Sequence, residues 1–331
     1  MKFENVNEPL LEVKGLSKYY TAKSNKILSK RKDIKVVQHI DLGIYPGEVF
    51  GLVGESGCGK STFAKMLVDV INPTKGQITY KGRNYSAMSH QEKKEYHKQI
   101  QIIFQDPYSS LNPKKKIGWI LEEPLKIHLN LTSQERKMKV EEVLEEVGLD
   151  ASFKGKYPNE LSGGQRQRVS IAAALMLNPE LIIADESVSA LDVSIQSQIL
   201  NLMKKLQEEK NLTYLFISHD LNVVQYMSDR IGVMYFGKLV EVGSVNDIYH
   251  EPKHPYTKAL LSSIPSVSGE EKRERILLTG DVPDLSAPPG GCSFHSRCRE
   301  MKESCKEKCP ELVDIGNGHF VSCHCVPSSA P

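Results

Sequence analysis

Short apolar runs and longer amphipathic segments alternate along the chain. The apolar runs at 49–53, 181–184 and 214–217 are bounded by polar residues, which is typical of strands buried in a core. Residues 116–128 and 133–147 instead repeat apolar side chains at helical spacing. The pattern therefore predicts an α/β protein in which a mostly helical part is inserted between the strands.

The two ends of the chain differ in character. Residues 10–13 and 36–44 are predicted to be strands at the start of a core domain that spans 1–250. The helical part of this domain is expected at about 106–178. The remaining segment, 251–331, is rich in Gly, Pro and charged residues, and we expect it to form a small C-terminal extension.

Composition narrows the class of protein. With 331 residues, 40% of them hydrophobic and 25% charged, the chain is long enough for one α/β core with additions. A net charge of +2 gives no case for nucleic-acid binding. No continuous apolar stretch is long enough to cross a membrane, and the polar start is unlike a signal peptide, so we expect any membrane attachment to come through partners. The basic stretch 23–35 is predicted to be a solvated loop, with contact to anionic lipid as the alternative.

The segment after the first apolar run matches the pattern G-x-x-x-x-G-K-[ST]. Backbone N–H groups of such a turn can surround a phosphate, and the helix that begins near Lys60 directs its positive dipole end at the same anion. Lys60 is predicted to reach the β- and γ-phosphates of ATP, and Ser61 to bind Mg²⁺. Cys58 occupies a variable position, and we predict no chemical role for it. The predicted ATP-binding loop consists of Gly54, Glu55, Ser56, Gly57, Cys58, Gly59, Lys60, Ser61 and Thr62.

A second glycine turn precedes the helix that is predicted at 165–177. Ser162 is a good N-cap, and Gly163 and Gly164 leave the backbone amides after it uncovered. Such a turn is either a second phosphate-facing helix N-terminus or only a cap, and the sequence that follows favours the first reading.

Two acids close the second apolar run. Because neighbouring residues of a strand face opposite sides, Asp185 and Glu186 are predicted to have different tasks. Asp185 is assigned to Mg²⁺ through its water shell, and Glu186 to the attacking water as general base. His219 follows the third run, where it is either structural or a contact to the γ-phosphate. The other motifs of the sequence favour the phosphate contact for His219.

These motifs, in this order, resemble those of the ATP-binding subunits of ABC transporters over nearly the whole chain. The resemblance identifies Gln105 as the Q-loop glutamine and a Mg²⁺ ligand with Ser61 and Asp185, and His219 as the switch histidine. It implies a P-loop ATPase core with an antiparallel β subdomain and a helical subdomain. Tyr20 best fits the adenine-stacking position, with Tyr19 as the alternative. The signature then comprises Ser162, Gly163, Gly164 and Gln165, and the D-loop comprises Ser189, Ala190, Leu191 and Asp192.

Longer strings narrow the resemblance to the F-type subunits of oligopeptide, dipeptide and nickel importers. Ser187 and Ala173 depart from the usual Pro and Arg of that family. The resemblance implies a head-to-tail ATPase heterodimer with a D-type homologue, in which the signature of one chain caps ATP on the other. It also implies two permeases, an extracytoplasmic solute-binding protein and a place at the cytoplasmic face of the membrane. Peptides are favoured over nickel on resemblance alone. The strings are FQDPYSSLNP, ELSGGQRQRVSIA, ADESVSALDVSIQ and KHPYTKALLSSIP.

Six of the seven cysteines lie in the last forty residues. This segment has few apolar residues, so we expect it to need a covalent cross-link or a bound metal for stability. Disulfides are disfavoured in a cytosolic ATPase, and only Cys305 and Cys309 approach the spacing of a zinc site. The subfamily motif GCxFxxRC implies a [4Fe-4S] cluster, with Zn²⁺ or reduced thiols as alternatives. Cys325 and Cys309 are then surplus. The cluster ligands would be Cys292, Cys298, Cys305 and Cys323.

A rival function is that of soluble ABC-type ATPases that act on DNA or ribosomes. Those proteins typically carry a coiled-coil insertion or two tandem ATPase domains. This sequence has one P-loop, no heptad run and the HPYTKALLSSIP segment, which favour transport. A regulator without turnover would be expected to lack Glu186 or His219.

Overall fold

The computed structural model describes residues 8–21, 33–264, 274–280, 283–286 and 288–327. Most of the basic stretch predicted to be a loop, and the first seven residues, lie outside these ranges. The described residues fall into two compact units, which are described separately. The first comprises residues up to Leu11, Gly43–Val49 and Thr79–Ile217, and the second comprises Glu12–Leu42, Phe50–Ile78 and the residues from Ser218 onward.

The first unit has a parallel sheet at its centre. β7 (Leu181–Asp185) pairs with β6 (Ile100–Ile103) on one side and with β8 (Thr213–Ile217) on the other. Every residue of β7 and β8 is buried, which explains why their apolar runs are continuous rather than alternating. The register places Asp185 opposite Ile217, so both strands end at the same edge.

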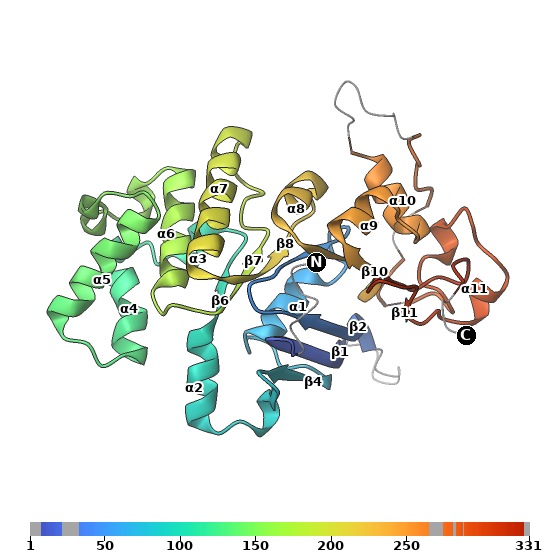
Figure 1. The fold of residues 1–331 in the computed structure, drawn as a ribbon, viewed down its shortest axis with the longest axis horizontal. Helices are drawn as coiled ribbons and strands as arrows, with labels where there is room; N and C mark the ends of the chain where they lie inside the picture. Colours follow the sequence, from blue (N-terminus) through green and yellow to red (C-terminus); the bar gives the residue numbers. More distant parts are fainter. Residues whose placement is uncertain (1–7, 22–32, 265–273, 281–282, 287, 328–331) are drawn as a thin grey trace, which may run out of the picture. The chain divides into compact units, whose positions relative to one another are not determined.

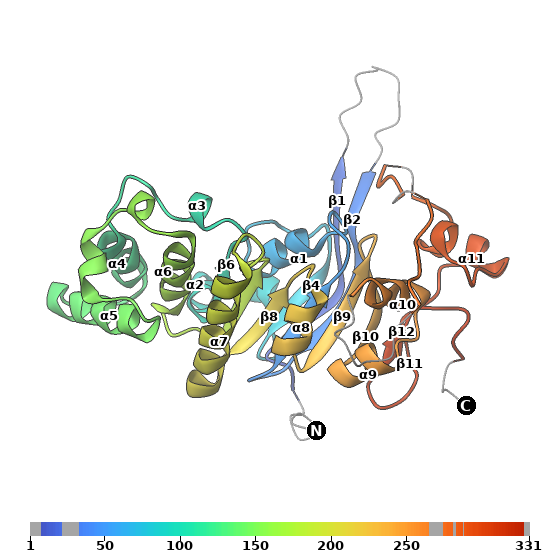
Figure 2. The ribbon, with the colours of Figure 1, turned by 90° about the horizontal axis from the view of Figure 1, so that it is seen from above.

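Three helices of this unit pack together, as Figures 1 and 2 both show: α4 (Ile117–His128), α5 (Ser133–Glu146) and α6 (Gly163–Leu175). α4 buries apolar residues four apart, and α5 begins at a capping box formed by Thr132 and Glu135. The helices predicted at 116–128 and 133–147 are confirmed to within one residue at each end. α6 begins two residues earlier than predicted because its glycines are already helical.

The second unit contains the P-loop strand. β3 (Val49–Val53) pairs in parallel with β9 (Arg230–Tyr235), and β10 (Lys238–Ser244) pairs antiparallel with β9. The sheet continues through β12 (Phe320–Val321), whose Val321 lies opposite Glu241 of β10. The cysteine-rich end of the chain is therefore joined to the same unit as the P-loop by backbone hydrogen bonds.

The strands predicted at 10–13 and 36–44 exist but are longer, forming β1 (Leu11–Thr21) and β2 (Asp33–Ile44). In the second unit they neighbour β4 (Lys75–Tyr80) in the order β2, β1, β4. The expected antiparallel pairing is seen at the far end of β4, where Thr79 lies opposite Asn84 of β5 (Arg83–Asn84).

The remaining elements are short or connect those above. In the described ranges, no helix has both the length and the apolar character that a membrane crossing requires. In the first unit these elements are η1 (Tyr85–Ala87), α2 (His90–Gln99), α3 (Pro107–Ser110), η2 (Ala151–Gly155), η3 (Pro158–Glu160) and α7 (Val193–Lys210). In the second unit they are α1 (Lys60–Leu67), α8 (Leu221–Met227), α9 (Val245–His250), α10 (Pro255–Ser262), η4 (His295–Arg297), α11 (Ser304–Glu307) and β11 (Val313–Asp314).

Candidate nucleotide-binding site

The P-loop joins β3 to α1 in the second unit, and two of its glycines, Gly54 and Gly59, are sterically required. Gly59 is the N-cap of α1 with φ 109°, and a Cβ there would lie 2.6 Å from the carbonyl oxygen of Val36. At Gly54 a Cβ would lie 2.1 Å from the carbonyl oxygen of Met234. Gly57 has φ 79°, and a Cβ there would meet nothing within 4 Å, so the outer side of this turn is open. Such a cradle fits a phosphate group.

Lys60 is enclosed by the loop that precedes it. The residue is 4% exposed, and its ammonium donates to the carbonyl oxygens of Gly54 at 2.7 Å and of Glu55 at 3.2 Å. The sulfur of Cys58 lies 3.9 Å from the same nitrogen. Burial raises the pKa of the Cys58 thiol, so it is neutral at physiological pH. Ser61 and Thr62 follow Lys60 in the first turn of α1.

The C-terminal part of the chain supports the P-loop from outside, which sequence reasoning missed. The backbone N–H of Glu55 donates to the hydroxyl of Tyr256, at 2.9 Å, and the carboxylate of Glu55 binds the guanidinium of Arg297. The only signal in the sequence was that the HPY and GCxFxxRC strings contain Tyr256 and Arg297. Neither spacing nor periodicity connects these strings to the P-loop.

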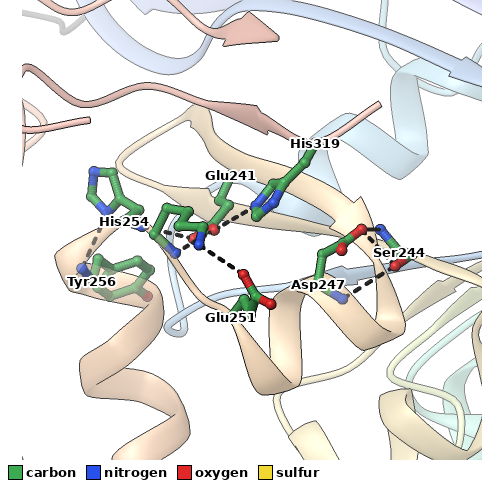
Figure 3. Close-up of polar contacts among 8 residues, drawn as sticks. Glu241, Ser244, Asp247, Glu251, His254, Tyr256 and His319 are labelled. Atoms are coloured by element: carbon green, nitrogen blue, oxygen red, sulfur yellow. Dashed lines mark hydrogen bonds and ion pairs between the residues drawn. The ribbon is translucent and has the colours of Figure 1, made fainter. Parts of the chain in front are cut away.

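A buried carboxylate fixes the start of α10 and hence Tyr256. Glu241, which is fully buried, accepts from the N–H groups of Lys253 at 2.7 Å and His254 at 3.0 Å, and from Nε2 of His319 at 2.8 Å (Figure 3). Nδ1 of His254 in turn accepts from the N–H of Tyr256, at 3.1 Å, and so caps the helix. Sequence reasoning gave no role to any of these groups.

The predicted carboxylates lie in the first unit, at the end of β7. Asp185 is 3% exposed, and Glu186 follows it with the unusual backbone φ of 48°. The N–H of Glu186 donates to the carbonyl of Ile217, at 2.9 Å. Gln105 is brought to the same place, and its Nε2 donates to Oε2 of Glu186 at 2.8 Å. The Q-loop and the proposed general base are therefore in direct contact.

The signature turn forms the predicted N-cap. The hydroxyl of Ser162 accepts from the N–H of Gln165 at 3.3 Å, and Oε1 of Gln165 accepts from the N–H of Ser162 at 3.0 Å. This reciprocal capping box begins α6.

The D-loop lies beside the signature turn in the same unit. A Cβ on Gly164 would come within 2.6 Å of Ile195, and one on Gly163 within 3.6 Å of Leu191. Asp192 caps α7, because its carboxylate accepts from the N–H of Ile195 at 3.0 Å. This hydrogen bond lowers the pKa of Asp192. Ser189 and Ala190 precede it, and the hydroxyl of Ser189 donates to the carbonyl of Glu186.

Two further predicted residues, Tyr20 and His219, lie in the second unit with the P-loop. Tyr20, near the end of β1, is 41% exposed, and the Lys18 ammonium lies 5.2 Å from its ring centroid. His219 is exposed in the short connection between β8 and α8. The predicted Mg²⁺ ligands Ser61, Gln105 and Asp185 supply only oxygen donors, which fit this hard cation.

The four cysteines proposed as cluster ligands share one region of the second unit, but they do not form a metal site. The pKa values of Cys298 and Cys323 are raised to about 11, mainly by burial and in smaller part by the nearby Cys292 and Cys325. All seven cysteines are described, and none forms a disulfide. Across the described ranges, no group of three or more His, Cys, Asp or Glu side chains is arranged to hold a metal ion. The iron-sulfur and zinc interpretations therefore find no support in this geometry.

Comparison with known proteins agrees with this chemistry. Residues 37–189 match the sequence model of the family "ABC transporter". The dimeric cassette MJ0796, solved in a post-hydrolysis state with ADP and Pi, aligns with 71% of this chain and 98% of its own, at 29% identity and a TM-score of 0.63. The protein is thus an ATPase of the ATP-binding cassette class.

The similarity extends through the C-terminal region. Residues 240–305 match the sequence model "Oligopeptide/dipeptide transporter, C-terminal region". The oligopeptide transport ATP-binding protein AppF of Bacillus subtilis is 52% identical over 96% of this chain and 97% of its own. The dipeptide transport ATP-binding protein DppF of Escherichia coli is 44% identical over 97% and 96%. The chain belongs to the family of ATP-binding subunits of oligopeptide and dipeptide ABC transporters.

Proposed function

We propose that this chain is the ATP-hydrolysing motor of a peptide importer. The observation that carries the proposal is similarity over nearly the full length, C-terminal region included, to proteins named for oligopeptide and dipeptide transport. Its proposed partners are two permeases, an extracytoplasmic solute-binding protein and a second, D-type ATPase. Through the permeases it would lie at the cytoplasmic face of the membrane.

The proposed chemistry divides among the residues described above. The loop 54–62 holds the phosphates, Tyr20 stacks on adenine, and Ser61, Gln105 and Asp185 hold Mg²⁺. Bound Mg²⁺ neutralises charge on the transferring phosphoryl group. Glu186, oriented by Gln105, accepts a proton from the attacking water on a carboxylate oxygen, and His219 contacts the γ-phosphate.

A head-to-tail dimer would complete each site. We propose that the capped turn 162–165 of one chain covers ATP held by loop 54–62 of the other, with the D-loop 189–192 alongside. Two observations support this: the turn is a serine-capped helix start, and the similar cassette MJ0796 was solved as a dimer with ADP and Pi. Hydrolysis would then open the pair and drive the permeases.

The [4Fe-4S] cluster remains a separate proposal, which rests on the family motif GCxFxxRC in the sequence. Iron and acid-labile sulfide should be measured in anaerobically purified protein. Iron and sulfide in about equal amounts would support the cluster. Zinc without iron would support a zinc site instead of the cluster. If the protein contains neither zinc nor iron, the cysteines are reduced thiols without a metal.

Isolation of the tagged subunit from native membranes in mild detergent tests the transport role. Two permeases and a different ATPase should accompany it, and ATPase activity of the complex should rise with a peptide-loaded binding protein. A complex stimulated only by a nickel-loaded binding protein would change the substrate class. Recovery of no membrane protein, while a control transporter stays intact, would favour a soluble ABC-type ATPase.

A further inference from the structure

The strongest contact between the C-terminal region and the P-loop is an ion pair within the second unit. Nη1 of Arg297 lies 2.7 Å from Oε2 of Glu55, and Nη2 lies 3.0 Å from Oε1. The two side chains are only 7% and 26% exposed. Such a bidentate pair is more directional than an exposed ion pair and is less screened by solvent. Nε of Arg297 has no partner among the described residues, so Glu55 is the main counterion of the buried guanidinium.

Arg297 is presented by a rigid turn. It ends η4, and the residues around it, 291–309, are here called the cysteine module. The N–H of Cys292 donates to the carbonyl of Cys305 at 2.8 Å, which closes the module on itself. The N–H of Arg297 donates to the carbonyl of Phe294, at 3.0 Å. The backbone that carries the guanidinium is thus fixed on both sides.

An aromatic cluster fixes the module to the core of this unit. Phe294 is 2% exposed, and its ring centroid lies 5.2 Å from that of Tyr235, 5.4 Å from that of Tyr256 and 5.7 Å from that of His254. Contacts of this kind between aromatic rings add stability beyond that of the area they bury. The module cannot shift without disturbing Tyr256, which also binds the P-loop.

Glu55 is consequently held through three of its groups, the backbone N–H, the backbone carbonyl and the carboxylate. Its N–H donates to Tyr256, its carboxylate binds Arg297, and its carbonyl accepts from the ammonium of Lys60. A displacement of Glu55 therefore moves its own carbonyl, which orients the ammonium of Lys60. The contacts of Glu55 with Tyr256 and Arg297 join residues about 200 and 240 positions apart in sequence. They are therefore tertiary contacts and not part of the local turn.

We propose that Arg297 is a positioning residue for the P-loop, which couples the fold of the cysteine module to the affinity for ATP. Arg297 touches no substrate in this role and acts only through Glu55. Coupling between two sites is reciprocal, so ATP binding should also stabilise the module. The inference depends on ATP binding at loop 54–62 and not on the transported solute, so failure of the peptide-import proposal would leave it intact.

The first test compares full-length Arg297→Ala, Arg297→Lys and Glu55→Gln with wild type. Dissociation constants for mant-ATP, KM and kcat for ATP, and the thermal midpoint should be measured for each. Arg297→Ala is expected to raise Kd and KM about tenfold with little change in kcat. Arg297→Lys should bind ATP more tightly than Arg297→Ala does, because lysine keeps the positive charge but cannot make the bidentate contact of the guanidinium. In the double variant Arg297→Ala/Glu55→Gln, the two losses should not add.

Arg299→Ala is the matched control, because Arg299 lies in the same module and, among the described residues, donates to the carbonyl of Leu277 and not to the P-loop. It should bind mant-ATP as wild type does. A folded Arg297→Ala protein with unchanged Kd and KM would overturn the proposal. If Arg297→Ala fails to fold, Glu55→Gln decides, because it removes the carboxylate charge and leaves the sequence of the module unchanged. An unchanged Kd for that variant would also overturn the proposal.

Hydrogen exchange distinguishes coupling to ATP from a purely structural role of Arg297, because a structural role alone would not make exchange depend on ATP. The amides of 292–298 should exchange more slowly when wild-type protein is saturated with ATP, and this protection should disappear in the Arg297→Ala protein. Equal protection in both proteins, or none in wild type, would refute the coupling.

Discussion

The side-chain amide of Gln105 donates a hydrogen bond to the carboxylate of Glu186, with Nε2 2.8 Å from Oε2. The two residues are 81 positions apart, and Glu186 adopts a backbone conformation with φ 48° that non-glycine residues rarely occupy. An oriented carboxylate at a strand end suits the general-base role that is proposed for Glu186.

Replacement of Glu186 by Gln should lower kcat for ATP hydrolysis by about a hundredfold to ten-thousandfold. The amide keeps the shape of the side chain but cannot accept the proton from water. ATP binding should persist, and the protein should accumulate as an ATP-bound dimer in size-exclusion chromatography. Glu209→Gln is the control, because Glu209 is an exposed partner of Lys205 on α7. Hydrolysis by Glu186→Gln at the normal rate would remove the base assignment.

Local signals explain why much of this site was predictable. The capping box of Ser162 and Gln165 lies within four consecutive residues, and the P-loop pattern lies within residues 54–62. Contacts between distant segments were not predictable in this way. No periodicity links Gln105 to Glu186, and only the family order suggested that they share a site. No pattern in the sequence predicted the contact between Arg297 and Glu55, which lie 242 positions apart.

The hydrophobic pattern also failed to predict where some strands end. The prediction for the first strand stopped at residue 13 because apolar alternation fades there, yet β1 continues to Thr21. Its later residues are partly exposed and are held by backbone pairing and by contacts such as that between the Tyr19 N–H and Thr74. Backbone pairing leaves no alternating side-chain pattern where both faces of a strand are partly exposed, as they are at the end of β1.

Replacement of Ser187 by Ala should stabilise the protein by about 1 kcal/mol. Ser187 is 3% exposed, and its hydroxyl has no hydrogen-bond partner among the described residues. Removal of that hydroxyl abolishes a desolvation penalty while nearly preserving shape. Urea unfolding measures the change. Ser189→Ala is the comparison, because its hydroxyl donates to the carbonyl of Glu186, at 2.9 Å, and it should show no gain. A lower midpoint for Ser187→Ala would mean that the hydroxyl is paired.

Replacement of His319 by Leu should destabilise the protein by roughly 3 kcal/mol. His319 Nε2 lies 2.8 Å from the fully buried carboxylate of Glu241, and its loss leaves that charge with fewer donors. The pair also joins β10 to the segment that leads into β12. Thermal and urea midpoints should both fall. The exposed His250, changed to Leu, is the control for loss of a histidine in the same unit; equal midpoints for the two variants would show that the buried pair contributes nothing.

Acid should destabilise the protein through His254. Burial lowers the pKa of this histidine from 6.5 to about 4, with Glu241 opposing the shift and Lys258 adding to it. Between these two values the unfolded chain binds a proton that the folded chain does not, so the free energy of unfolding falls as pH decreases through this window. The loss from His254 should reach about 2 kcal/mol between about pH 7 and about pH 5. The pKa of Glu241 is lowered from 4.5, so its own contribution is lost only at still lower pH.

The His254→Asn variant isolates this contribution. Asn is a good N-cap and can accept from the N–H of Tyr256 as His254 does, but it does not titrate. Urea unfolding of both proteins at about pH 7 and about pH 5 should show a smaller loss in the variant, by about 2 kcal/mol. If the two proteins lose equal stability, His254 must already be protonated in the folded state at about pH 5, and the acid sensitivity must come from other groups.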